Sequence, residues 1–210
     1  MATADEDTGE RGLDLGRVLA LSDGVFAIAL TLLVLDLAVP HLNPDRAGST
    51  LARALLNDWG HDLAYVLSFY VIGLYWRGHR RMFRHILRSD ERLIALNLLL
   101  LLLVAYLPYP TAVLAAYGDT QPAVVFYAAS VAATSFASWL LWWYASAGHR
   151  LVAEDLDRRE VRRGSFSALV PVAVFSISIA LSFLSTPAAY WTWGLGQWAG
   201  QWAANRWLDA

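Results

Sequence analysis

An apolar run near the N-terminus, from Arg17 to Val39, constrains the fold of this chain more than any other feature. A transmembrane helix needs roughly 20 apolar residues, and the stretch RVLALSDGVFAIALTLLVLDL supplies them before Pro40. Similar segments follow at about 61–80, 92–115, 121–146, 164–185 and 187–208. The chain is 57% hydrophobic and 16% charged, which is typical of a membrane protein. We therefore predict an all-α, polytopic membrane protein with six transmembrane helices.

These helices are expected to form one transmembrane domain, residues 17–208, after a polar tail. Residues 1–16 are acidic and polar, unlike the basic start of a signal peptide, and we expect a disordered cytosolic tail. In the third segment, Pro108 and Pro110 predict a kink or an end of the helix, because proline cannot donate a backbone hydrogen bond.

The sixth segment is rich in Trp, Gly and Gln, and a helix lying on the membrane surface is the alternative to a span. Its small residues Gly196, Gly200 and Ala204 recur every four positions. This spacing lets a neighbouring helix approach closely, as in packed transmembrane helices. We therefore favour a sixth span.

The arginine distribution predicts the orientation of the helices. All 16 basic residues are Arg, and only Arg46 and Arg53 fall on one side of the predicted spans. The other 14 lie at the opposite ends of the spans or in the segments attached to those ends: the tail, the connection between the second and third spans, the connection between the fourth and fifth, and the C-terminus. Because cytoplasmic loops carry the excess of basic residues, both termini are predicted to be cytosolic.

The sequence carries no positive signal for an enzyme. It has no Cys, no phosphate-binding glycine loop and no catalytic motif, and its five His residues are not spaced as metal ligands. We expect no cofactor, no resident metal and no nucleic-acid partner. The stretch AAYGDT, residues 115–120, contains the Tyr-Gly of potassium-channel filters, but it lacks the Thr-Val-Gly-Tyr-Gly context and is predicted to be a turn.

The first span carries a serine and an aspartate about one third of the way into the bilayer. At 3.6 residues per turn, Ile28 and Leu35 share one aliphatic stripe, while Asp23 lies close to the opposite side and Ser22 also lies off the stripe. A charge inside a membrane is costly and nearly always faces protein or water. The stripe is therefore expected to face lipid, another subunit or a pore, and Asp23 to face other helices.

Three side chains are plausible partners for Asp23 at the same depth: His79 and Arg80 on the second span, and Asn97 on the third. A buried polar cluster that fixes helix packing is the interpretation that we favour. A proton relay is the functional alternative.

Three stretches of the sequence resemble those of a known family. The stretch RVLALSDGVFAIALTLLVLD, Arg17 to Asp36, resembles the R-x3-F-S-D signature of the transmembrane protein 175 family, the lysosomal potassium channels and their prokaryotic relatives. The stretches SFYVIGLYWRGHRRMF (68–83) and RLIALNLLLLLLVAYLPYPT (92–111) resemble its second and third helices.

The resemblance implies a homotetramer in a prokaryotic plasma membrane, with a central pore lined by the first helix. It implies a channel that passes potassium in preference to sodium without a carbonyl filter. Ile28 would form the hydrophobic constriction and Leu35 a second ring, while Thr31 would form the layer that favours potassium. The permeating potassium ion would be the only metal involved.

The resemblance also assigns four residues, Arg17, Ser22, Asp23 and His79, to an interhelical polar network behind the pore helix. A small secondary transporter or proton carrier that uses Asp23 and His79 remains an alternative, as does a membrane scaffold without transport. Inverted-repeat transporters have two related halves, and only one copy of the signature is present.

Overall fold

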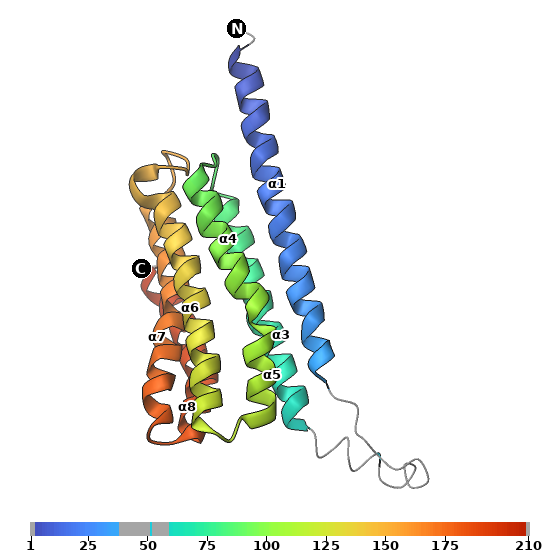
Figure 1. The fold of residues 1–210 in the computed structure, drawn as a ribbon. Coiled ribbons are helices and arrows are strands. Elements are labelled where there is room, and N and C mark those ends of the chain that lie inside the picture. The colour runs from blue at the N-terminus through green and yellow to red at the C-terminus, as the bar shows by residue number, and fades with distance from the viewer. Residues whose placement is uncertain (1–2, 38–50, 52–58, 209–210) are drawn as a thin grey trace.

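The computed structural model describes residues 3–37, 51 and 59–208, and the regular structure of this part of the chain is helical (Figure 1). The helices in chain order are α1 (Thr3–Leu32), the 3-10 helix η1 (Leu33–Asp36), α3 (Trp59–Phe83), α4 (Glu91–Tyr106), α5 (Pro108–Tyr117), α6 (Gln121–Ser146), the 3-10 helix η3 (Ala147–His149), α7 (Arg158–Ser182) and α8 (Thr186–Leu208). The predicted all-α fold class is confirmed.

The helices form an elongated bundle in which α1 lies along one edge (Figure 1). α1 packs against α3 and α4, and its N-terminal part extends beyond the ends of the other helices. α6 packs against α4, α5 and above all α7, while α8 packs mainly against α7. The side of α1 that faces away from α3 and α4 is therefore left uncovered in a single chain.

The predicted break in the third span is present at Leu107, between α4 and α5. The backbone N–H of Leu107 donates to the carbonyl of Val104 at 3.1 Å, which tightens the last turn of α4. In a continuous α-helix that carbonyl would accept from residue 108, but Pro108 has no N–H to donate. The prediction that Pro108 and Pro110 interrupt the helix is confirmed.

α1 differs from the prediction at both ends. It begins at Thr3, so most of the segment 1–16, predicted to be a disordered tail, is helical. At the other end the α-helix stops at Leu32 and continues as the 3-10 helix η1, whereas the sequence predicts one helix up to Val39. The α-helical wheel therefore holds only as far as Leu32.

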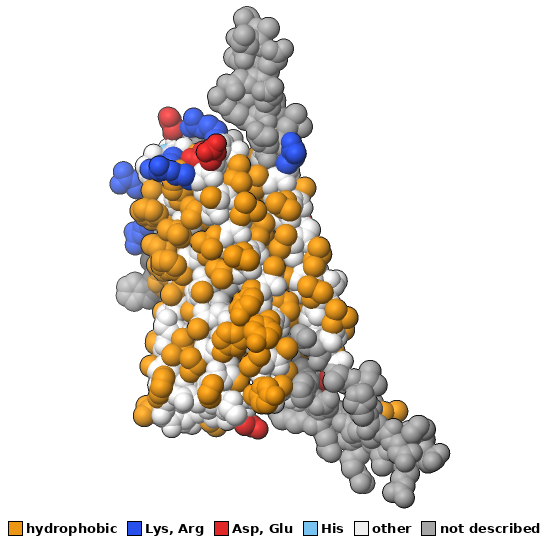
Figure 2. Space-filling view, viewed as in Figure 1, with side chains coloured by type: hydrophobic (Ala, Val, Ile, Leu, Met, Phe, Trp, Pro, Cys, Tyr) orange, Lys and Arg blue, Asp and Glu red, His pale blue; other side chains and the backbone are white. Residues whose placement is uncertain are grey.

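Four helical segments of the described chain are long and apolar enough to cross a membrane: Leu15–Leu35, Glu91–Tyr117, Gln121–His149 and Arg158–Ser182. α3 and α8 have 25 and 23 residues, which is also sufficient length. In the visible face, apolar side chains cover most of the bundle, and arginines gather towards one end (Figure 2). A polytopic membrane fold follows, while the count of six spans stays a prediction.

Glycines of α8 allow the close approach of a neighbouring helix that the sequence predicts, and the structure shows that this neighbour is α7. A Cβ on Gly196 would lie 2.9 Å from a methyl carbon of Val174, and a Cβ on Gly200 would overlap the side chain of Val170. Real Cβ atoms essentially never approach so closely, so both positions require glycine unless the helices move apart. Ala204, the third residue of the predicted repeat, lies outside the residues whose side chains are described.

Replacing Gly200 by leucine is expected to destabilise the bundle by about 1–3 kcal/mol, because the added side chain overpacks the α7–α8 contact. Gly194 of the same helix is the matched control, since a Cβ added there would have no atom within 4 Å. Thermal unfolding in detergent measures both. A Gly200→Leu protein as stable as Gly194→Leu would contradict the close packing.

Asp90 fastens the arginine-rich end of the bundle. Its carboxylate caps α4 by accepting from the backbone N–H of Leu93 at 2.7 Å, and it accepts from the Tyr144 hydroxyl of α6 at 2.6 Å. Burial alone would raise the pKa of the Asp90 carboxyl, but these hydrogen bonds and the nearby Arg150 hold it below its usual value. The turn before α4 is thereby tied to the end of α6.

Candidate functional site

One face of α1 is buried against the bundle. Ser22, Phe26 and Ala29 are each at most 1% exposed and recur at intervals of four and three residues. This interval is the repeat of one helical face. Leu33, the first residue of η1, is equally buried and continues this face. The Phe26 ring lies 5.6 Å from the ring of His79 on α3, measured between centroids. The buried face therefore joins α1 firmly to its neighbour.

The opposite face of α1 is aliphatic and exposed. Ile28 is 59% exposed and Leu35 is 74% exposed, and Gly24 and Thr31 on the same side are exposed as well. Leu35 belongs to the 3-10 helix η1, yet it still points away from the bundle. The wheel prediction that Ile28 lies on a face separate from Ser22 agrees with this arrangement.

Behind α1, three buried polar side chains form a chain of hydrogen bonds between three helices. The Asn97 amide nitrogen of α4 donates to the Ser22 hydroxyl of α1 at 3.0 Å, and the Asn97 carbonyl oxygen lies 2.8 Å from Nε2 of His79 on α3. All three residues are at most 1% exposed. Buried polar groups inside a membrane bundle need such partners, and here Asn97 supplies both.

His79 has a second, open ring nitrogen. Its Nδ1 atom is buried and has no hydrogen-bond partner in the described part of the chain. The ring is held between aromatic neighbours, stacked on Phe83 with centroids 4.3 Å apart. The side chain is thus oriented by packing and by one hydrogen bond.

Asp23 has a different partner from those that the sequence suggests. Its Oδ1 atom accepts from the indole N–H of Trp76 on α3 at 2.7 Å, whereas His79, Arg80 and Asn97 were the predicted partners. Arg80 approaches only indirectly, with its guanidinium carbon 5.3 Å from the centre of the Trp76 ring. Asp23 is exposed, at the flank of the buried face. The predicted direct pairing is therefore wrong.

Within one copy of the protein, hydrogen bonds do not connect all four residues of the predicted polar network. Ser22 and His79 are connected through Asn97, Asp23 is bonded to Trp76, and Arg17 is exposed with no hydrogen bond to the other three. The sequence prediction included Asn97 only as a partner for Asp23, and it did not include the Trp76 indole as a hydrogen-bond donor. The three-residue spacing of Trp76 and His79 along α3 was the available signal, since it puts both on one helix face.

Thr31 donates its hydroxyl to the backbone carbonyl of Ile28, three residues earlier, at 2.9 Å. Such back-bonding is common for threonine in helices. It uses the hydroxyl hydrogen and leaves the oxygen with free lone pairs on the exposed face. The AAYGDT stretch is a turn only in its second half: residues 115–117 are the end of α5, and the turn follows at 118–120, where the Thr120 hydroxyl donates to the Tyr117 carbonyl at 2.7 Å.

The fold and this site define a polytopic helical membrane protein whose first helix is anchored by buried polar contacts on one face and exposes an aliphatic stripe on the other. Residues 17–108 match the family described as the endosomal/lysosomal potassium channel TMEM175. A Streptomyces collinus protein named as a potassium channel is 38% identical over 184 residues, 86% of this chain and 88% of that protein. The chain belongs to the TMEM175 family.

Two further relatives show the range of this similarity. The crystal structure of a Chamaesiphon minutus protein, described as a homologue of the lysosomal potassium-selective channel TMEM175, has a TM-score of 0.75 and 32% identity, covering 94% of this chain and 99% of that chain. The human endosomal/lysosomal proton channel TMEM175 is 24% identical over 154 residues, 73% of this chain but 30% of the human protein.

Proposed function

We propose that this chain forms a cation channel that passes potassium in preference to sodium, as a homotetramer with the exposed face of α1 around a central pore. The observation that carries the proposal is the division of α1 into a buried face and an exposed aliphatic face. Relatives named as potassium channels support the choice of ion. In this assembly Ile28 is the constriction and Leu35 a second hydrophobic ring.

Small and polar residues within the exposed face favour a pore over a purely lipid-facing surface. Gly24 has no atom within 4 Å of its Cβ position, and Thr31 keeps lone pairs available beside Ile28. A ring of aliphatic side chains excludes water from a narrow neck, so an ion must shed hydration to pass. Such a neck controls conduction without a ring of backbone carbonyls.

A proton carrier that uses Asp23 and His79 is the second candidate. The name of the human relative and the open Nδ1 atom of the buried His79 favour it. The separate partners of the two residues weigh against a direct transfer between them, because Asp23 is bonded to Trp76 and His79 to Asn97. We therefore assign both residues to the contacts that hold α1 in place.

Flux from liposomes tests the function. The purified chain should carry potassium down its gradient faster than sodium, with little movement of protons at neutral pH. Proteoliposomes that pass neither cation would reject the channel, and proton flux without potassium flux would establish the second candidate.

Replacing Thr31 by valine is expected to lower the permeability ratio of potassium to sodium while the channel still conducts. Valine keeps the shape of the side chain and removes the oxygen that would replace part of the hydration shell of the ion. Bi-ionic reversal potentials measure the ratio. An unchanged ratio would mean that the Thr31 hydroxyl only closes the hydrogen bond to Ile28.

The proposed location is the plasma membrane of a prokaryote, with both termini in the cytosol. Single cysteines at Asp119, between α5 and α6, and at Glu154, between η3 and α7, test it, because the chain has no native Cys and both positions are exposed. In intact cells a membrane-impermeant maleimide should label position 119 and spare position 154. Labelling of both, or of position 154 alone, would contradict the orientation.

A further inference from the structure

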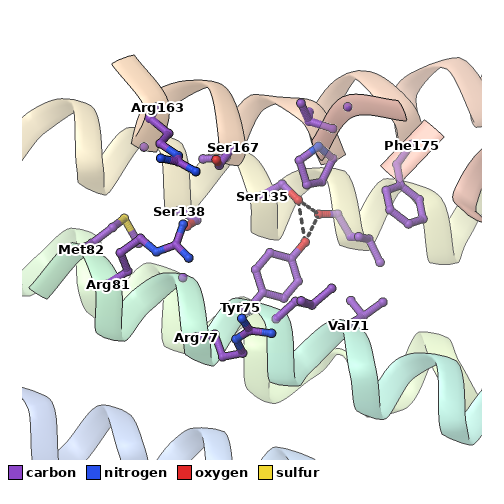
Figure 3. Close-up of a pocket in the computed structure, with 18 residues that line it drawn as sticks. Val71, Tyr75, Arg77, Arg81, Met82, Ser135, Ser138, Arg163, Ser167 and Phe175 are labelled. Atoms are coloured by element: carbon purple, nitrogen blue, oxygen red, sulfur yellow. Dashed lines mark hydrogen bonds between the residues drawn. The ribbon is translucent and has the colours of Figure 1, made fainter. Parts of the chain in front are cut away.

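A cavity on the side of the bundle away from α1 carries the next inference. It has a volume of about 380 Å³ and lies between α3, α6 and α7, with Gly200 of α8 at its edge. None of the pore or network residues discussed above lines it. Figure 3 shows its side chains reaching inward from these helices.

The cavity is basic at one end and apolar at the other. Arg81 of α3 and Arg163 of α7 line its end nearest to the arginine-rich surface, and Arg77 lies further along α3, close to Tyr75. Val71 and Phe175 line it deeper in the bundle. No Asp or Glu is among its described lining residues. Arginines that converge in a lining without carboxylates make a site for an anion, and guanidinium groups suit phosphate oxygens because they donate paired hydrogen bonds.

Hydroxyl groups and a helix irregularity continue the lining between the two ends. The Tyr75 hydroxyl lies 2.6 Å from the Ser135 hydroxyl. Pro171 sits within α7 and cannot donate to the carbonyl of Ser167, another lining residue, four positions earlier. From Val71 to Met82 the lining of α3 extends roughly 16 Å at 1.5 Å per residue, enough for a phosphate group and the first part of an acyl chain.

We propose that this cavity binds an anionic phospholipid from the leaflet at the arginine-rich end of the bundle, with the phosphate held by Arg77 and Arg81 and an acyl chain directed towards Phe175. Basic pockets between transmembrane helices recognise anionic headgroups in this way. The apolar inner end distinguishes a lipid from a free anion, since inorganic phosphate gains nothing from contact with Val71 or Phe175. The proposal concerns a lipid site and holds whichever ion the pore carries.

The test titrates the purified full-length protein in detergent with phosphatidylglycerol or phosphatidylcholine and follows lipid-bound protein by native mass spectrometry. The double variant Arg77→Gln/Arg81→Gln should bind phosphatidylglycerol roughly 30-fold more weakly, at about fivefold per arginine. The control Arg84→Gln/Arg88→Gln removes the same charge from exposed positions outside the cavity. It should stay within about twofold of the wild type, because electrostatic attraction to a headgroup falls off with distance and these two arginines do not line the cavity.

A second variant blocks the cavity without changing its charge. Ser138→Trp fills the space beside the arginines and should also weaken phosphatidylglycerol binding, whatever the folding of the arginine double variant. Normal binding by Ser138→Trp would place the lipid elsewhere and overturn the proposal. Equal binding of phosphatidylglycerol and phosphatidylcholine would also overturn the proposal. So would an equal loss of phosphatidylglycerol binding in the two double variants, because general surface charge would then explain the effect. Displacement of the lipid by an equal concentration of inorganic phosphate would identify a free anion as the ligand instead.

Discussion

Replacing Ile28 by asparagine is expected to raise the unitary potassium current roughly tenfold, which corresponds to a barrier lowered by about 1.4 kcal/mol. Asparagine is similar in length to isoleucine but offers hydrogen bonds, so water stays in the neck and the ion sheds less of its hydration. Ile28→Ala should raise the current by widening the neck, with weaker preference for potassium. Single-channel recording in planar bilayers measures all three proteins.

Ile177 provides the matched control for this result. It is an isoleucine of α7 that is 55% exposed, close to the 59% of Ile28, and it lies on a helix that is not proposed to line the pore. Ile177→Asn should leave the unitary current unchanged. If Ile28→Asn and Ile28→Ala likewise conduct as the wild type does, Ile28 faces lipid or another helix, and the proposed lining of the pore fails.

Replacing Asn97 by leucine is expected to cost about 2–6 kcal/mol of stability, because two buried partners lose a hydrogen bond at about 1–3 kcal/mol each. Ser22 would retain only its bond to the Val18 carbonyl at 2.8 Å, and His79 would have no described partner for either ring nitrogen. Loss of the assembled protein in detergent is the expected outcome, measured by size-exclusion elution and thermal unfolding.

Asp23→Asn is the companion variant. Its amide oxygen can still accept from the Trp76 indole, so the contact at 2.7 Å is preserved, and the residue lies at an exposed flank of α1. It should assemble nearly as the wild type does, with a smaller loss than Asn97→Leu. The reverse order of stability would show that the carboxylate, and not the amide of α4, holds α1 in place.

Much of the fold follows from local patterns that no distant contact overrides. The fourth predicted span, 121–146, coincides with α6, and the second and sixth agree with α3 and α8 to within three residues at each end. α7 begins at Arg158, six residues before the predicted fifth span. Bilayer thickness fixes span length, and the missing N–H of Pro108 fixes the break between α4 and α5. The extension of α1 to Thr3 escaped prediction, because an acidic, polar stretch gives no apolar repeat to read.

The contacts of α1 are also partly determined by the sequence and partly only by the tertiary structure. The sequence by itself determined that Ile28 lies on an aliphatic stripe away from Ser22, because helical periodicity alone sets that angle. Only the tertiary structure decided that Asp23 accepts from Trp76 and that Asn97 joins Ser22 to His79. Depth in the bilayer limited the possible partners of Asp23 to side chains at the same depth. Which of these side chains contacts Asp23 depends on how three helices are rotated against one another. That rotation is set by the packing of the whole buried surface, and no single segment of the sequence encodes it.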